Sequence, residues 1–234
     1  DNTEPRQREK MVAKRTTYQE VITERQLDII RGSLLGDGYL PKLRSENHLP
    51  WFSCTSSRPE YATWKYAELA NLCTRGISTR RRKDGRSGKE HTAYDVSTAC
   101  HPQLRGWRET WYPQGIKVVP EDVIQWLTPL CIAVWFMDDG YRENDGRHGN
   151  KVYHGRRYFF STDAFSKFDR HRLVVAFVQR YKLYPEFRAI SEKKYRLAFN
   201  RQDSQKLAEI MRPHMIPVFE YKFDIFSPDV RCND

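Results

Sequence analysis

The chain has 234 residues, and its 40 Lys and Arg against 30 Asp and Glu give a formal net charge of +10 at pH 7. Such an excess attracts polyanions and indicates a nucleic-acid partner, without choosing between DNA and RNA. The longest apolar run, residues 123–137, is interrupted by polar residues and proline and is too short to cross a membrane.

The five cysteines, at positions 54, 73, 100, 131 and 232, form no Cys-x-x-Cys pair. This argues against a zinc site and indicates reduced thiols in an intracellular protein, with the compartment left open. Residues 1–19 are charged and poor in apolar side chains, so we expect a flexible basic tail there, and a second tail at 227–234.

The first predicted helix begins at Thr23, which forms a capping box with Gln26, and ends at Asp37-Gly38. It carries Gly32 and Gly36 four residues apart. Small residues at this spacing share one face and let a second helix approach closely. We therefore expect this helix to pack against another helix.

The next segment alternates between strand and helix patterns. Ser57 and Glu60 have the spacing of a capping box. The predicted elements are a strand at residues 49–55, a helix from Ser57, a hairpin of strands at 77–82 and 92–99, and a helix at 102–111.

A second buried helix is predicted at residues 127–140, where Thr128 is a good N-cap and Pro129 suits the first turn. It is apolar all round and ends on Asp138 and Asp139. Acids are unfavourable at a helix C-terminus, where the macrodipole prefers cations. We therefore expect a positive partner there, most simply a bound metal ion.

The order of elements then repeats. Asp37 and Asp139 are 102 positions apart, Phe52 and Phe160 are 108 apart, and Tyr94 and Tyr195 are 101 apart. The remaining elements are a strand at 158–161, a helix at 170–181 after a capping box of Ser166 and Asp169, strands at 187–191 and 195–200, and a helix at 204–211. These predict an α/β fold of two αββαββα halves, at 20–122 and 123–226, in preference to two unrelated α+β domains.

Two motifs resemble the LAGLIDADG homing endonucleases, in the single-chain form that carries both. They are Gly-Ser-Leu-Leu-Gly-Asp-Gly at residues 32–38 and Leu-Thr-Pro-Leu-Cys-Ile-Ala-Val-Trp-Phe-Met-Asp-Asp-Gly at residues 127–140. Val134 departs from the family by standing where its motif has the first Gly. The resemblance implies two motif helices at a pseudo-two-fold interface and saddle-shaped antiparallel sheets that face DNA.

The residues and the resemblance indicate the same chemistry, which is hydrolysis of phosphodiesters with a divalent metal ion. Carboxylate ligands suit hard cations, and Asp37 and Asp139 are the expected ligands. Asp138 either shares a metal or caps a loop, and the backbone carbonyls of Gly36 and Asp138 are further candidate ligands. We expect Mg²⁺ as cofactor, with Mn²⁺ able to replace it and Ca²⁺ binding without supporting cleavage.

Two lysines match basic positions that the family places beside the metals. They are Lys117 and Lys222, in corresponding loops after each half. The resemblance gives them a catalytic role in orienting water or offsetting developing charge.

Basic residues gather in the predicted hairpins, where we expect DNA contacts. Period-two alternation places Arg80 and Arg82 on one face, from which arginine can read guanine, whereas lysines in turns suit phosphates. A solvated surface is the alternative for any single residue. The predicted DNA-binding set is Arg80, Arg81, Arg82, Lys83, Arg86, Arg142, Arg147, Arg156, Arg157, Arg188, Lys193, Lys194 and Arg196.

The expected function is therefore a site-specific double-strand DNA endonuclease that acts as a monomer on a long asymmetric target. Two alternatives use the same scaffold. One is a group I intron maturase that binds RNA, and the other is a noncatalytic DNA-binding protein.

Overall fold

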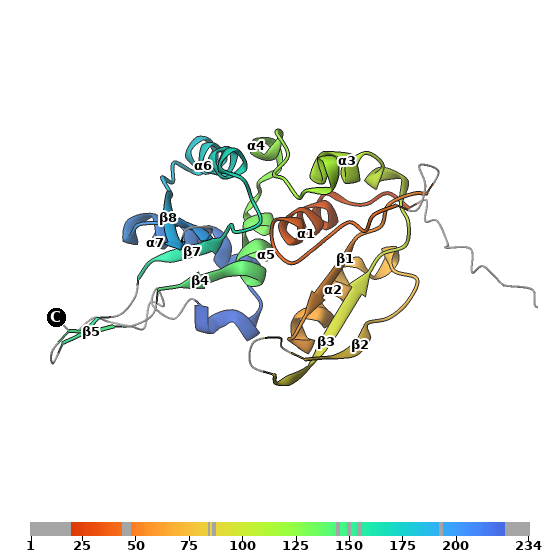
Figure 1. The fold of residues 1–234 in the computed structure, drawn as a ribbon, viewed down its shortest axis with the longest axis horizontal. Coiled ribbons are helices and arrows are strands. Elements are labelled where there is room, and N and C mark those ends of the chain that lie inside the picture. Colours follow the sequence, from red (N-terminus) through yellow and green to blue (C-terminus); the bar gives the residue numbers. More distant parts are fainter. Residues whose placement is uncertain are drawn as a thin grey trace, which may run out of the picture.

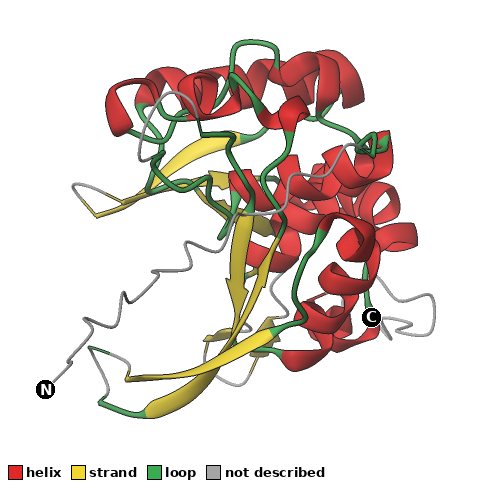
Figure 2. Cartoon of the chain, turned by 90° about the vertical axis from the view of Figure 1, so that its right-hand side faces the viewer, coloured by secondary structure: helices red, strands yellow, loops and turns green. Residues whose placement is uncertain are grey.

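The computed structural model describes residues 20–43, 48–83, 85, 88–143, 146–148, 151–153, 156–191 and 194–222, and gives only the backbone of 146–148 and 151–153. Both predicted tails and Cys232 lie outside these residues. Figure 1 shows α1 and α5 at the centre, with β1, β2 and β3 on one side and β4, β7 and β8 on the other. Figure 2 shows the strands gathered on one side of the molecule and most helices on the other.

The predicted starts of both central helices are confirmed. α1, Glu24–Leu35, begins with the capping box of Thr23 and Gln26. α5, Pro129–Asp139, begins at Thr128, whose side chain accepts a hydrogen bond from the Cys131 amide. All residues from 130 to 137 are buried, as expected for a helix that is apolar all round.

The two central helices touch at residues that correspond in the repeat. A Cβ added to Gly32 would lie 2.5 Å from the Cys131 carbonyl oxygen and 2.8 Å from the Val134 Cβ. One added to Gly36 would lie 2.5 Å from the Asp138 Cβ. Gly32 and Val134 are 102 positions apart, as are Gly36 and Asp138. Each glycine therefore faces its own counterpart, as at a pseudo-two-fold axis, and Val134 fills the space beside Gly32.

Two antiparallel sheets follow the central helices. The first has the order β1-β3-β2, and a bridge joins Tyr39 to Ser53 at its edge; the second has the order β4-β7-β9-β8. The strands are β1 (Ser53–Ser56), β2 (Ser78–Lys83), β3 (Glu90–Ser97), β4 (Gly140–Arg142), β7 (Tyr158–Ser161), β8 (Glu186–Ser191) and β9 (Lys194–Ala198), with a separate hairpin of β5 (Gly146–His148) and β6 (Lys151–Tyr153). The other α-helices are α2 (Pro59–Leu69), α3 (Trp107–Trp111), α4 (Val123–Trp126), α6 (Lys167–Tyr181) and α7 (Arg201–Met211).

The predicted alignment of the halves is wrong by two residues at the first strand. The Thr98 amide donates to the Phe52 carbonyl at 3.0 Å, and the Phe199 amide donates to the Tyr158 carbonyl at 2.9 Å. Phe52 therefore corresponds to Tyr158, 106 positions on, and not to Phe160. A slip of two residues keeps the same sheet face, so alternation alone does not detect it.

The predicted helix starts outside the central pair were partly correct. The capping box of Ser166 and Asp169 is confirmed for α6. The one predicted at Ser57 and Glu60 is wrong, because α2 begins at Pro59 without a side-chain cap. Pro59 fixes the first helical residue, since its missing N–H needs no partner there.

A single hydrophobic core joins the central helices to both sheets. Trp135 of α5 packs on Phe160 of β7 with ring centroids 4.3 Å apart, and Phe160 meets Phe177 and Phe199 from α6 and the end of β9. Four cysteines, at 54, 73, 100 and 131, are buried and free. No helix in the described part of the chain is long and apolar enough to span a membrane.

We predict that Gly32→Ala lowers the free energy of unfolding by about 1–3 kcal/mol, because its Cβ would overlap the backbone of α5. Urea unfolding measures the change. Gly76→Ala is the matched control, since a Cβ there meets nothing within 4 Å. Equal effects of the two substitutions would show that the close contact does not limit stability.

Candidate metal and nucleic-acid site

The ends of the two central helices bring three carboxylates together. Asp37 follows Gly36, the C-cap of α1, and Asp138 and Asp139 end α5. Burial, then the neighbouring Asp37 and Asp138 carboxylates, raises the pKa of Asp139 to about 7. Asp37 keeps contact with solvent, yet partial desolvation and then Asp138 raise its pKa. Asp37 and Asp139 thus lie within each other's electrostatic field.

Two lysines lie at the helix ends, where the sequence predicted a positive partner, most simply a metal ion. Lys117 Nζ donates to the carbonyl oxygens of Gly36 at 2.8 Å and Gly38 at 3.0 Å. Lys222 Nζ donates to those of Gly140, Phe136 and Met137 at 2.6, 2.9 and 3.1 Å. Each ammonium therefore satisfies carbonyls left open at a helix C-terminus and offsets its negative end.

Burial lowers the pKa of both lysines to about 8, against the opposing pull of the acids. The two sites differ in one respect. An ammonium has three N–H donors, and the three carbonyls around Lys222 use all of them. Lys117 donates two of its N–H groups to carbonyls in the described residues and retains the third N–H for another partner.

The Asp138 side chain has a partner that was not predicted from the sequence, Lys65 of α2. Its carboxylate oxygens lie 2.8 and 3.2 Å from Lys65 Nζ, and both side chains are only 2% exposed. The Asp138 carboxylate is therefore held by a buried ion pair with Lys65. The sequence offered one indication of Lys65, which follows Tyr61 by four residues on the buried face of α2.

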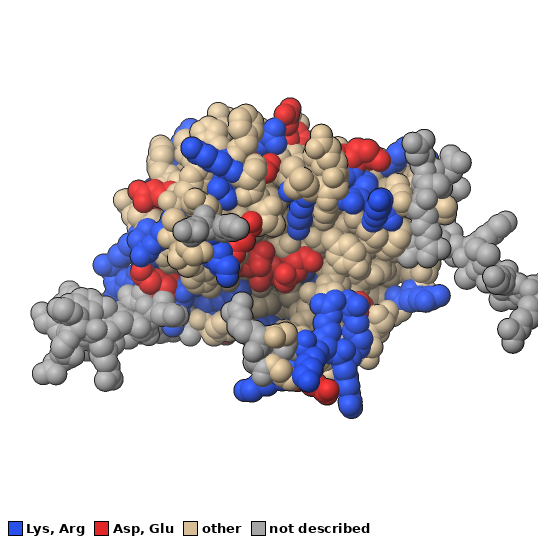
Figure 3. Space-filling model, viewed as in Figure 1, with Lys and Arg blue, Asp and Glu red and all other residues tan. Residues whose placement is uncertain are grey.

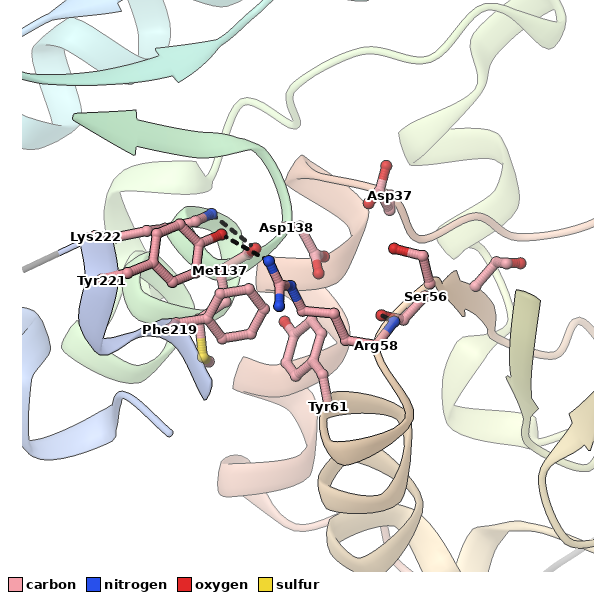
Figure 4. A pocket seen from close by; sticks show the side chains of 11 residues that line it. Asp37, Ser56, Arg58, Tyr61, Met137, Asp138, Phe219, Tyr221 and Lys222 are labelled. Carbon is pink, nitrogen blue, oxygen red and sulfur yellow. Dashed lines mark hydrogen bonds between the residues drawn. The ribbon is translucent and has the colours of Figure 1, made fainter. Parts of the chain in front are cut away.

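A pocket of about 160 Å³ opens beside these groups (Figure 4). Arg58 lies across it, with the guanidinium carbon 5.4 Å from the Phe219 ring centroid and 5.2 Å from that of Tyr221. Its Nη2 also donates to the Tyr221 hydroxyl at 3.2 Å. Phe219, Tyr221 and Lys222 all belong to the short helix η5, Pro217–Lys222.

The donor set fits a hard divalent cation. The Asp37 carboxylate raises the pKa of Asp139, so a cation between the two would relieve their repulsion. Within the described residues no group of three or more His, Cys, Asp and Glu side chains is arranged to hold a metal. The candidate ligands are consequently these two carboxylates with backbone oxygens, of which the Gly36 carbonyl already accepts from Lys117.

The basic residues of the first sheet lie as alternation predicted. Arg80 and Arg82 occupy alternate positions of β2, so they share a face, and both are exposed. Asp95 of β3 binds Arg80 through two contacts of 2.8 Å, to Nε and Nη2. Thr55 in turn donates to Asp95 at 2.5 Å. Arg80 is thereby held in one orientation on the outer face.

The second sheet is arranged differently. Arg196 is ion-paired with Asp163 and its side chain is only 15% exposed, so it is less available than predicted. Arg188 is exposed and lies directly opposite Arg196 in the β8–β9 register. Arg157 Nε donates to the Phe199 carbonyl at 3.2 Å.

The other residues predicted to contact DNA differ in their exposure to solvent. Arg81, Lys83 and Lys194 are exposed, whereas Arg142 and Arg156 are half-buried. Arg86, Lys193 and the side chain of Arg147 lie outside the described residues. Figure 3 shows acidic side chains between groups of basic ones on one face of the molecule.

Neighbouring acids at the helix ends, together with exposed basic residues on both sheets, are the features expected of a protein that acts on nucleic acid. Residues 27–207 match the LAGLIDADG DNA endonuclease family. The chain therefore belongs to this family.

Similar proteins come from several sources. Protein RecA of Mycolicibacterium fallax is 30% identical over 208 residues, which are 86% of this chain and 47% of that protein. Cytochrome b mRNA maturase bI2 of Debaryomyces hansenii is 24% identical over 88% of this chain and 76% of that protein. The chain thus spans about half the length of the RecA relative.

The fold is also that of solved homing endonucleases. The structure of I-WcaI bound to its DNA recognition sequence superposes with a TM-score of 0.75, at 19% identity, over 87% of each chain. The predicted homing-endonuclease-like α/β fold is confirmed.

We predict that Asp139→Asn stabilises the metal-free protein at pH 8 by on the order of 1–3 kcal/mol. Because the folded pKa of about 7 exceeds the ordinary 3.8, the wild type loses stability as pH rises through this interval. Urea unfolding in EDTA from pH 4 to 8 measures the difference, which should vanish near pH 4. A difference independent of pH would contradict the assigned burial of this acid.

Proposed function

We propose that this protein is a site-specific, metal-dependent endonuclease that cleaves both strands of a long, asymmetric DNA target as a monomer. The observation that carries the proposal is the meeting of Asp37 and Asp139 at the ends of α1 and α5, beside two exposed basic sheet faces. Family membership and the likeness to a DNA-bound homing endonuclease support it.

Asp37 and Asp139 would hold the divalent ions, for which Mg²⁺ is our first choice. A bound ion supplies activation of water and stabilisation of the leaving oxygen. The remaining N–H of Lys117 can orient water or approach a phosphate oxygen. Lys222 instead fixes the end of α5, and so the position of Asp139, through its three carbonyl contacts.

Asymmetry of the target follows from differences between the sheets. Asp95 and Arg196 are counterparts, because the Cys54–Val96 and Phe160–Leu197 pairs align β3 with β9 at an offset of 101. An acid in one half thus replaces a base in the other. One chain with both halves needs no partner copy, and cleavage of a randomised DNA library should yield sites without palindromic symmetry.

Group I intron RNA maturation is the second candidate, because the bI2 maturase is similar over most of its length. Binding of the excised intron RNA, compared with a duplex DNA library at equal salt, separates the two functions. A noncatalytic DNA-binding role is less supported, since both motif acids are present.

We predict that Asp37→Asn and Asp139→Asn each reduce the rate of strand cleavage in Mg²⁺ by about a thousandfold or more, since the ions supply several kcal/mol of transition-state stabilisation. Binding of the target in Ca²⁺, measured by gel shift, should persist. Glu109→Gln, at an exposed acid of α3, is the control and should cut normally. Cleavage near the wild-type rate by either Asn variant would exclude the proposed mechanism.

We also predict that Asp95→Asn relaxes discrimination at one base pair, by about 1–3 kcal/mol, because it releases the arginine best oriented to read guanine. Lys83→Ala should instead weaken all targets alike and reduce the salt slope by about 0.9. Quantitative binding to single-substitution targets at several salt concentrations measures both. The same effect from both variants would show that Arg80 does not read a base.

A further inference from the structure

A buried lysine lies beneath the acids at a place that neither motif indicates. Lys65 of α2 is 1% exposed, and both carboxylate oxygens of Asp138 lie within hydrogen-bond distance of its Nζ. The Tyr61 ring centroid lies 4.2 Å from the same nitrogen. In the described part of the chain, Asp37 and Asp139 have no comparable ion pair.

Asp138 occupies the centre of the acid cluster. It faces Gly36, its own counterpart in the repeat, and a Cβ on Gly36 would lie 2.9 Å from Asp138 Oδ2. Its negative charge contributes to the raised pKa of both Asp37 and Asp139, whereas the charge of Lys65 lowers that of Asp37. A change of charge at either member of the buried pair therefore alters the electrostatic potential at Asp37 and Asp139.

Stability alone is a weak explanation for this pair. Burying two charges costs several kcal/mol each, and well-packed apolar residues of similar volume often stabilise a protein as well or better. Removing only one member is strongly destabilising, because it leaves a buried charge uncompensated.

We propose that Lys65 withdraws the Asp138 carboxylate from metal binding, so that the site offers two charged carboxylates to a divalent cation instead of three. Lys65 is thus a positioning residue that sets the charge of the site from the N-terminal half. The inference rests on the proposed function, in which Asp37 and Asp139 are the metal ligands.

The physical consequence concerns the substrate as well as the metal. A third free carboxylate would bind cations more tightly but would repel the phosphates of DNA. With Asp138 neutralised by Lys65, Asp37 and Asp139 supply the only uncompensated acid charges among the three. Compared with a site of three free carboxylates, this site binds cations less tightly and repels the DNA phosphates less.

The test measures Ca²⁺ affinity by calorimetric titration, which requires no cleavage. Lys65→Met should bind Ca²⁺ about tenfold more tightly and Asp138→Asn about tenfold more weakly, near the low end of the effect of one unit charge a few ångströms away. The double variant, Lys65→Met with Asp138→Asn, removes both charges and should bind within about threefold of wild type. Circular dichroism checks that each variant is folded.

A purely structural pair makes a different prediction, since both single variants would then lose affinity together. That result would overturn the inference. If Lys65→Met does not fold, the double variant is compared with Asp138→Asn and should bind about tenfold more tightly. Equal affinities in that comparison would overturn it as well.

Failure of the proposed function is recognised separately. If wild-type protein and Asp139→Asn are alike in failing to bind Ca²⁺, the metal site itself is absent and the endonuclease assignment fails. If the wild type binds Ca²⁺ and Asp139→Asn does not, the metal site is supported. The role of Lys65 is then decided by whether Lys65→Met and Asp138→Asn change the Ca²⁺ affinity in opposite directions.

Discussion

The contact between α1 and α5 is the constraint on which the rest of the structure depends. Gly32 and Gly36 allow the backbones to approach so closely that a single methyl group would overlap the opposing helix. Because each glycine meets its own counterpart, the helix ends meet as well, and so do the acids that follow them. A wider separation of the helices would draw Asp37 and Asp139 apart.

This arrangement creates an electrostatic problem at the helix C-termini. Two negative helix ends and three carboxylates converge there, and three lysines offset them in different ways. Lys117 and Lys222 bind the terminal carbonyls, whereas Lys65 binds a carboxylate. Asp37 and Asp139 are left without an ion pair in the described residues, which is the condition in which they can hold a cation.

The two halves share a scaffold but not a surface. Backbone hydrogen bonds align Phe52 with Tyr158, and the cores of the two sheets follow the same pattern. On the outer faces, Asp95 orients Arg80 in one half, whereas Asp163 restrains Arg196 in the other. Shared geometry at the acids and different side chains on the sheets suit a protein that performs one reaction on two unlike half-sites.

The sequence alone determined the features that depend on local chemistry. Thr23 and Thr128 capped their helices as predicted, because a cap needs only residues within one turn. The glycine spacing predicted that α1 packs closely on another helix, and the Asp-Gly pairs at 37–38 and 139–140 marked corresponding positions of the two halves. Alternation placed Arg80 and Arg82 on one face.

Only the tertiary structure decided the features that depend on partners distant in the chain. Lys65 and Asp138 are 73 positions apart, and nothing in either local sequence indicates that their charges meet. The ion pair of Arg196 with Asp163 and the register of the strands likewise depend on residues that are distant in the chain. An isolated lysine or arginine in a sequence is a surface residue by default, and only the packing of helices and sheets shows which of them is buried against an acid.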